Sequence, residues 1–378
     1  MISSRATFYT LSVIAFPALL GGLLVNGTMA AMYRAWASGT FADGFPCYHV
    51  YSGLPVIDWI EAIQVTFWTP IVQNGAELLQ ARMLCASLQT AGLWAAIENT
   101  RKGSKHWILQ YAPIYAFLWG ACGVATLLPI YCSVELSQRL TNTSPRLPLA
   151  KARALIPAIF IGLMYPYYLM LMRPASTTPV QHQAFITFYQ FSPFFVYACI
   201  QTFGSFLWKD EDKVAGPDAD SYFVKAAYAI AGVWSAVAYI SVLLISLFSS
   251  APGVSFTRVF VPSFTAVSKA TAGTHIKEGS FLFMQIDYII VAVACGIYAV
   301  KTLEMMWLGS PEKAAAAPRW NHAVAAATVF TTVSTCLLGP GATVSAVLFA
   351  REGFLRKWRP EAKEGVVNGF KPLTNGTM

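Results

Sequence analysis

Long apolar segments recur along this chain and constrain its fold more than any other feature. A helix needs roughly 20 mainly apolar residues to cross the hydrocarbon core of a bilayer. Nine segments reach or approach this length, at about 7–32, 55–73, 78–98, 107–134, 152–172, 184–208, 223–249, 281–308 and 320–350. The pattern predicts an all-α fold, a polytopic transmembrane helical bundle of about 8–9 spans.

The composition agrees with a membrane protein and excludes several other classes. Only 12% of the 378 residues are charged, 56% are apolar, and the mean hydropathy is +0.52. These values exclude a water-soluble globule, a disordered chain and a disulfide-rich secreted module. No basic stripe alternates with base-stacking aromatic residues, so the bilayer, and not a nucleic acid, is the expected partner.

The gaps between the apolar segments are short, so residues 1–350 are expected to form a single transmembrane bundle domain. Residues 351–378 form a basic polar C-terminal tail. Its basic residues are Arg351, Arg356, Lys357, Arg359, Lys363 and Lys371. A basic segment that follows an apolar span is typical of an anchor against anionic lipid.

Four carboxylates lie within or next to the predicted spans, where an ionised group costs about 3 kcal/mol on insertion scales. They are Asp58, Glu61, Glu98 and Asp287. If nine spans cross the bilayer alternately, all four acids lie near one membrane face. The same half also receives Tyr115, Tyr189 and Gln190. This convergence predicts a pocket of acids and aromatic rings that opens to one face, and it depends on the span count.

Structural roles compete with catalytic ones for three of these acids. Glu98 and Arg101 are spaced to form an interfacial ion pair that closes a helix. Asp58 lies where negative charge favours a helix N-terminus, and Glu61 is close enough to a span end to reach the interface. Asp287 lies deeper and has no basic neighbour within a turn or two of its own helix, so a functional role is favoured there.

Motifs for metal or cofactor chemistry are absent from the sequence. There is no DDxxD or other Asp-rich motif to hold Mg²⁺ and a diphosphate, and no Gly-rich phosphate loop. There is also no CxxC motif and no paired histidine motif. We therefore expect no metal and no cofactor, and ionisation of a diphosphate is not favoured.

Several short motifs carry a resemblance to a known family. They are Tyr51-Ser-Gly-Leu-Pro-Val-Ile-Asp58, Phe67-Trp-Thr-Pro70, Glu98-Asn-Thr-Arg-Lys-Gly103, Leu128-Pro-Ile-Tyr131 and Gln285-Ile-Asp-Tyr288. Together they resemble the membrane-bound meroterpenoid cyclases of fungi, most closely the ascofuranone- and macrophorin-pathway type. The resemblance spans most of the chain, except the tail beyond residue 355 and the segment 250–280.

This resemblance implies a terpene cyclase of the endoplasmic reticulum membrane. Such an enzyme cyclises a farnesyl chain on an aromatic or quinone-like head group, and begins by protonating a terminal epoxide or an olefin. The chemistry fits the residues: a buried carboxyl keeps its proton, and aromatic faces stabilise a carbocation.

Asp287 is the first candidate for the general acid, followed by Glu61, Asp58 and Glu98. The candidate substrate-binding residues are Trp68, Arg101, Tyr115, Tyr189, Gln190 and Tyr288.

Two other functions remain open on the sequence alone. One is a membrane carrier of a small metabolite, which would move a substrate without changing it. The other is a diphosphate-dependent intramembrane prenyltransferase or cyclase, which would lose activity with EDTA.

Overall fold

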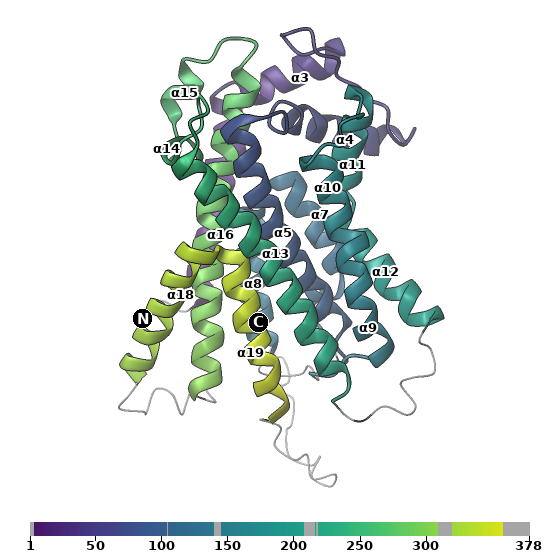
Figure 1. Ribbon diagram of the computed structural model, residues 1–378, viewed down its shortest axis with the longest axis vertical. Coiled ribbons are helices and arrows are strands. Elements are labelled where there is room, and N and C mark those ends of the chain that lie inside the picture. Colours follow the sequence, from purple (N-terminus) through teal and green to yellow (C-terminus); the bar gives the residue numbers. More distant parts are fainter. Residues whose placement is uncertain are drawn as a thin grey trace, which may run out of the picture.

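The computed structural model describes residues 4–103, 105–139, 145–207, 216, 218–308 and 320–357. Within these ranges the chain is helical apart from its connections and one isolated bridge between Thr40 and Pro46. The all-α prediction is therefore confirmed (Figure 1).

In the first half of the chain the elements are α1 (Ser4–Phe16), η1 (Pro17–Gly21), α2 (Gly22–Val25), α3 (Thr28–Ser38), α4 (Pro55–Trp68), α5 (Gly75–Thr100), α6 (Trp107–Gln110), α7 (Ala112–Cys122), α8 (Val124–Arg139), α9 (Leu149–Ala158), η2 (Ile159–Met164) and α10 (Tyr165–Leu171). In the second half they are α11 (Pro179–Gln190), α12 (Ser192–Phe206), α13 (Asp220–Phe248), α14 (Phe256–Phe260), α15 (Phe264–Ser268), α16 (His275–Leu308), α18 (Trp320–Leu338) and α19 (Pro340–Lys357). The segments η1 and η2 are π-helical and continue the helices on either side of them.

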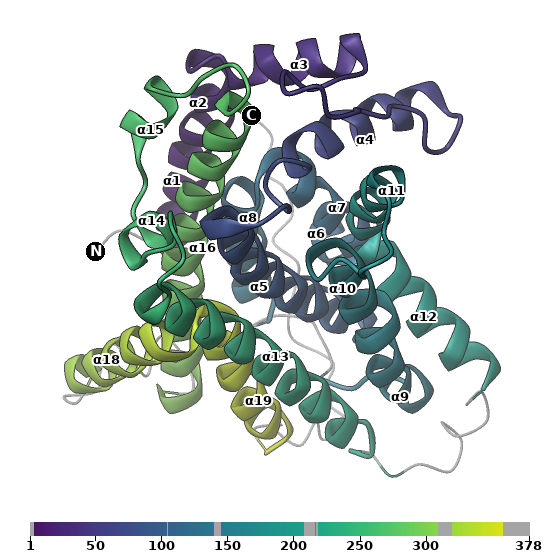
Figure 2. The same cartoon turned by 45° about the horizontal axis from the view of Figure 1, so that its top comes forward.

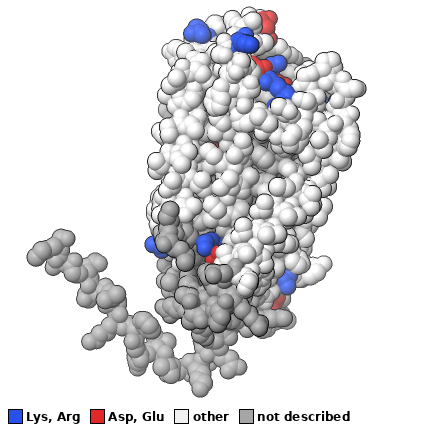
Figure 3. Space-filling model, turned by 90° about the vertical axis from the view of Figure 1, so that its left-hand side faces the viewer, with Lys and Arg blue, Asp and Glu red and all other residues white. Residues whose placement is uncertain are grey.

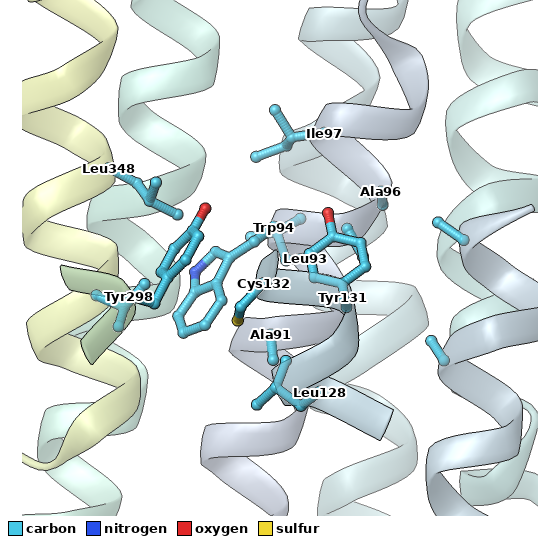
Figure 4. Packing of buried hydrophobic residues seen from close by; sticks show 14 of the residues in the cluster. Ala91, Leu93, Trp94, Ala96, Ile97, Leu128, Tyr131, Cys132, Tyr298 and Leu348 are labelled. Atoms are coloured by element: carbon cyan, nitrogen blue, oxygen red, sulfur yellow. The ribbon is translucent and has the colours of Figure 1, made fainter. Parts of the chain in front are cut away.

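Helix α5 lies at the centre of the bundle, and none of its 26 residues is exposed. Helices α7, α13, α16 and α19 pack around it (Figure 2). Figure 4 shows the packing in one layer of the core, where Trp94 of α5 lies close to Tyr131 of α8, Tyr298 of α16 and Leu348 of α19. A helix surrounded in this way carries its polar side chains into the protein interior.

Four helical segments are long and apolar enough to cross a membrane among the residues that the structure describes. They are Arg5–Val25, Leu149–Leu171, Asp220–Phe248 and His275–Trp307. On the face shown in Figure 3, charged side chains gather at the two ends and a broad band between them carries almost none. Among the described residues, four helical segments are therefore long and apolar enough to cross a membrane, whereas the sequence predicted eight or nine spans.

The predicted span at 55–73 differs from the observed structure. Its helix, α4, has only 14 residues and lies with α3 across one end of the bundle (Figures 1 and 2). Helix α5 therefore starts at the end where α4 lies and runs away from it. The prediction placed Glu98 at the same face as Asp58 because it counted 55–73 as a span. In the structure, Glu98 lies at the end of the bundle opposite to Asp58.

Two other predicted spans, 107–134 and 320–350, are helical hairpins that turn inside the bundle. Both turns use a glycine with positive φ, Gly123 (83°) between α7 and α8 and Gly339 (84°) between α18 and α19. The first hairpin is closed at its base, where His106 N donates to Gln138 Oε1 at 2.6 Å. Hydropathy does not reveal such turns, because both arms are apolar.

Three residues assigned to the basic tail, Arg351, Arg356 and Lys357, lie on helix α19 of the bundle instead. Helix α19 continues to Lys357, and Arg351 in it is 1% exposed. Arg356 forms ion pairs with Asp220 (2.7 Å) and Glu352 (2.8 Å). These two arginines therefore stabilise helix packing, whereas Arg359, Lys363 and Lys371 lie outside the described residues.

Candidate active site

Asp287 lines a cavity in the half of the bundle that α3 and α4 cover. The cavity lies among α2, α3, α4, α5, α7, α8 and α16. Its wall is apolar apart from the carboxylate of Asp287, the amide of Gln64 and the indole N–H groups of Trp68 and Trp119. Asp287 is 2% exposed, so the sequence-based expectation of a deeply buried acid agrees with its position.

The carboxylate of Asp287 is held by the N-terminus of α8. Ala125 N donates to Oδ1 at 2.7 Å, and Val124 N donates to Oδ2 at 3.4 Å. These N–H groups have no partner within their own helix, and a helix N-terminus favours negative charge. The contact exists because the chain turns at Gly123, where a side chain would meet Leu19 and Phe283. The same arrangement would also stabilise the anion left after Asp287 gives up a proton.

Aromatic rings form much of the wall around this carboxylate. Phe67 packs edge-on against Phe283 and Trp68, with ring centroids 5.3 and 5.2 Å apart. Trp119 completes the aromatic wall from the hairpin. The faces of such rings attract cations, so this cavity suits a positively charged intermediate.

A second cavity adjoins the first. Its wall shares Trp68, Leu88, Trp119, Gly120 and Val124 with the first cavity. Two predicted substrate-binding residues, Tyr189 and Gln190, lie in this second cavity, and Trp68 lies in both. The structure thus joins three of the predicted residues to the site of Asp287.

A third hollow lies between η1–α2 and α15–α16 and shares Leu23 and Phe283 with the Asp287 cavity. Val25 and Phe264 at this hollow are 91% and 68% exposed. The hollow therefore lies between the molecular surface and the wall of the Asp287 cavity.

Glu61 is buried beside these cavities but lines neither of the two that adjoin each other. It is 1% exposed, and neither carboxylate oxygen has a hydrogen-bond partner among the described residues. The Thr187 hydroxyl is near enough to favour the charged form, although not in hydrogen-bonding geometry. Glu61 lies on α4, which is not among the four candidate spans. Burial raises the pKa of its carboxyl group to about 7.

Asp58 is engaged by the loop that precedes α4. Its carboxylate accepts hydrogen bonds from Tyr51 N (3.1 Å), Ser52 N (2.6 Å), Ser52 Oγ (2.8 Å) and Gly53 N (2.9 Å). The hydrogen bond from the Ser52 N–H is the largest cause of a lowered pKa for Asp58. A carboxylate held in its charged form shapes this loop and is a poor proton donor at neutral pH.

Glu98 and Arg101 belong to an ion-pair network at the opposite end of α5. Arg101 contacts Glu98 (2.9 Å) and Glu352 (2.7 Å), while Arg351 contacts Glu98 and Glu135 (3.1 Å). All five side chains are at most 9% exposed. The network joins α5, α8 and α19, and the expected ion pair of Glu98 with Arg101 is one part of it.

Two predicted tyrosines lie outside the lining of the two adjoining cavities. The Tyr115 hydroxyl donates to Leu127 O at 3.0 Å and so ties α7 to α8. Tyr288 follows Asp287 on α16 and is 7% exposed.

Sequence reasoning missed Trp119, Gly120 and Phe283, which line the cavities. Their only signal was their place in apolar runs, which they share with many packing residues. No group of three His, Cys, Asp or Glu side chains that could hold a metal ion occurs within the described ranges.

This chain belongs to the CtvD-domain family, because the model of that family matches residues 4–356. Terpene cyclase DEP1 of Fusarium langsethiae is 27% identical over 371 residues, which cover 93% of this chain and 98% of the relative. DEP1 of Alternaria brassicicola is 25% identical with the same two coverages, 93% and 98%. Terpene cyclase ascI of Acremonium egyptiacum is 21% identical over 75% of this chain and 76% of the relative. No solved structure matches the chain.

These relatives confirm the resemblance to fungal terpene cyclases that the short motifs indicated.

Proposed function

We propose that this protein is an integral-membrane terpene cyclase that works by metal-free, proton-initiated cyclisation. Its substrate is a farnesylated aromatic compound with a terminal epoxide, and its location is the endoplasmic reticulum membrane. The observation that carries the proposal is the carboxyl group of Asp287 in an apolar, aromatic-walled cavity of a chain whose relatives are named terpene cyclases.

In the proposed reaction, Asp287 acts as the general acid. It transfers a proton to the epoxide oxygen, the C–O bond to the more substituted carbon breaks, and a tertiary carbocation forms. The π electrons of the neighbouring alkene attack this carbon and form the ring bond. Loss of a proton from the final cation restores the proton balance, so the product is an isomer of the substrate.

The surroundings of Asp287 support both halves of this step. A general acid must hold a proton, and burial away from cations is the environment in which a carboxyl does so. No ion pair to Asp287 occurs among the described residues, and its partners are the two N–H groups at the start of α8. These groups are already aligned for the anion that forms in the reaction, which lowers the cost of charge development.

Rings around the cavity support the carbocation steps. Phe67, Trp68, Trp119 and Phe283 present aromatic surface to the cavity, where ring faces would stabilise a carbocation. The hollow beside Leu23 and Phe283 supports access for an apolar chain from the bilayer. Glu61 is the second candidate for an acid or for the base that removes the final proton.

Product analysis tests this function. Microsomes that contain the protein would be given a farnesylated phenol and its terminal epoxide, with EDTA present. We expect an isomer of unchanged mass from the epoxide, and the olefin substrate reveals whether an epoxide is required. Absence of an isomer from both substrates, with folded protein in the membrane, would contradict the proposal and favour a carrier.

A further inference from the structure

Four buried polar atoms around the second cavity have no hydrogen-bond partner within the part of the chain that the structure describes. They are Trp68 Nε1, Trp119 Nε1, Gln190 Nε2 and Gln89 Oε1. Buried polar side-chain atoms are usually hydrogen-bonded, because leaving one without a partner costs free energy. Four such atoms around one cavity indicate a ligand that completes them.

Contacts with the protein hold these side chains in place. Gln89 Nε2 donates to Leu163 O at 2.7 Å, which leaves Oε1 as the free acceptor of that amide. Trp119 lies edge-on between Tyr115 and Tyr131, with ring centroids 6.2 and 5.9 Å away. These contacts fix the orientation of the Gln89 amide and of the Trp119 ring.

Gly120 makes room for the side-chain amide of Gln190. A Cβ atom on Gly120 would lie 2.7 Å from Gln190 Oε1, so a side chain there would displace the amide. The Gly120 carbonyl accepts a hydrogen bond from Gln64 Nε2 at 3.0 Å, which fixes this turn of α7.

The polar atoms define the chemistry of the ligand. Three of them are N–H donors, and one is a carbonyl acceptor. None of the described residues that line the cavity is charged, so an anionic phosphate or carboxylate would lose its hydration without a counter-charge. A neutral ring that carries carbonyl and hydroxyl oxygens matches both the donors and the acceptor, and its faces would contact Phe117 and Tyr189.

We propose that the second cavity binds the head group of the substrate, a neutral ring bearing carbonyl and hydroxyl oxygens. This inference rests on the proposed cyclase function. The indole N–H of Trp119 and the amide N–H of Gln190 donate to ring oxygens, and Gln89 accepts from a ring hydroxyl. The shared wall at Trp68 and Gly120 then leads the isoprenoid chain toward Asp287 in the first cavity.

The test compares two epoxides with the same farnesyl chain, one on a dihydroxyaryl ketone and one on an unsubstituted phenyl ring. A site built to hydrogen-bond its substrate rejects an analogue that lacks those groups, so we expect wild type to favour the ketone by at least about 100-fold in kcat/KM. Trp119→Phe and Gln190→Leu should each reduce this preference about 3- to 10-fold, mainly through KM.

Trp94→Phe is the matched control. Trp94 is equally buried, but its Nε1 donates to Ser345 Oγ at 3.0 Å, away from both adjoining cavities. This variant should keep the preference within about 2-fold of wild type, since no hydrogen bond to the ring is lost. Thermal unfolding midpoints of all variants establish that they are folded.

A binding measurement separates this inference from the cyclase function. The probe is the dihydroxyaryl ketone with a saturated C15 chain, which cannot cyclise, and the readout is the thermal shift of the full-length protein in detergent. Stabilisation that Trp119→Phe weakens, without turnover of either epoxide, would support the head-group site and contradict the cyclase. Equal kcat/KM for both epoxides, unchanged by Trp119→Phe, would overturn the head-group site and leave the cyclase intact.

Discussion

Two groups of buried carboxylates in the bundle have opposite surroundings. At the end that α3 and α4 cover, Asp287 and Glu61 are 2% and 1% exposed, and no ion pair reaches either of them among the described residues. At the other end, Glu98, Glu135 and Glu352 are equally buried, and each contacts an arginine. Burial is common to both groups, and only the cations distinguish them.

The difference separates stabilising acids from candidate catalytic ones. A carboxylate beside a buried arginine remains charged and joins helices, and removing its partner leaves an uncompensated charge. A buried carboxyl that has no cation, and lacks the four hydrogen bonds that hold Asp58 charged, favours its neutral form and has a proton to give. Depth in the membrane alone, the criterion available from sequence, does not make this distinction.

Asp287→Asn should have the largest effect on activity. Asparagine keeps one oxygen to accept from Ala125 N and is about as good as aspartate at a helix N-terminus, but it has no proton to transfer. We expect cyclisation to fall by about 10²- to 10⁴-fold or more, the usual contribution of a general acid, with little change in the thermal midpoint. Initial rates of product formation in microsomes measure the loss.

Asp287→Ala provides the comparison for that prediction, because it removes both the proton and the oxygen that holds α8. It should lower the thermal midpoint as well as the rate. Wild-type rates in Asp287→Asn would show that Asp287 only supports the helix.

Arg351→Met should have the largest effect on stability. It leaves Glu98 and Glu135 without one of their cations, and breaking a buried pair from one side costs about 3–5 kcal/mol. Thermal unfolding in detergent measures the change. A midpoint equal to that of wild type would contradict the stabilising role of the network.

Glu61→Gln should change how stability depends on pH. The pKa of Glu61 rises from 4.5 to about 7 on burial, so the folded state binds the proton more tightly than the unfolded state. The stability from this group is fully present below pH 4.5 and falls by about 3 kcal/mol as pH rises to about 7. Between pH 4 and 8, the thermal midpoint of Glu61→Gln should depend less on pH than that of wild type. The same pH dependence in both proteins would argue against a raised pKa for Glu61.

Tyr115→Phe should have the smallest effect. It removes the hydrogen bond to Leu127 O but keeps the ring contacts with Trp119, so about 1 kcal/mol of stability should be lost. Its cyclisation rate per folded molecule should match wild type, since the hydroxyl lies away from both adjoining cavities. A rate loss of more than about 10-fold would return Tyr115 to the substrate-binding set.

Much of the fold was predictable because apolar content directly reflects the helical bundle. The helix of Asp287 and its depth followed from a lone acid in a long apolar run. The turn at Gly123 was not predictable, because two apolar arms of a hairpin have the same hydropathy as one span. For the second hairpin, the run Gly339-Pro340-Gly341 was a visible turn signal inside an apolar segment.

The arrangement of the site depended on tertiary contacts that periodicity does not contain. The N-terminus of α8 reaches Asp287 from 162 residues away along the chain. Glu98 was grouped with Asp58 because α4 was counted as a span. One extra span reverses the predicted direction of α5, and so it moves Glu98 to the wrong end of the bundle. Arg351 was assigned to a tail because its partners, Glu98 and Glu135, lie on helices distant in sequence.

The most direct test of the account measures activity and stability together in Asp287→Asn and Glu98→Gln. Both replace a buried carboxyl by its isosteric amide, one without and one with arginine partners. The account predicts that Asp287→Asn loses cyclisation and keeps its thermal midpoint, whereas Glu98→Gln loses thermal stability and keeps its rate per folded molecule. Loss of cyclisation in Glu98→Gln, with retained activity in Asp287→Asn, would contradict the account.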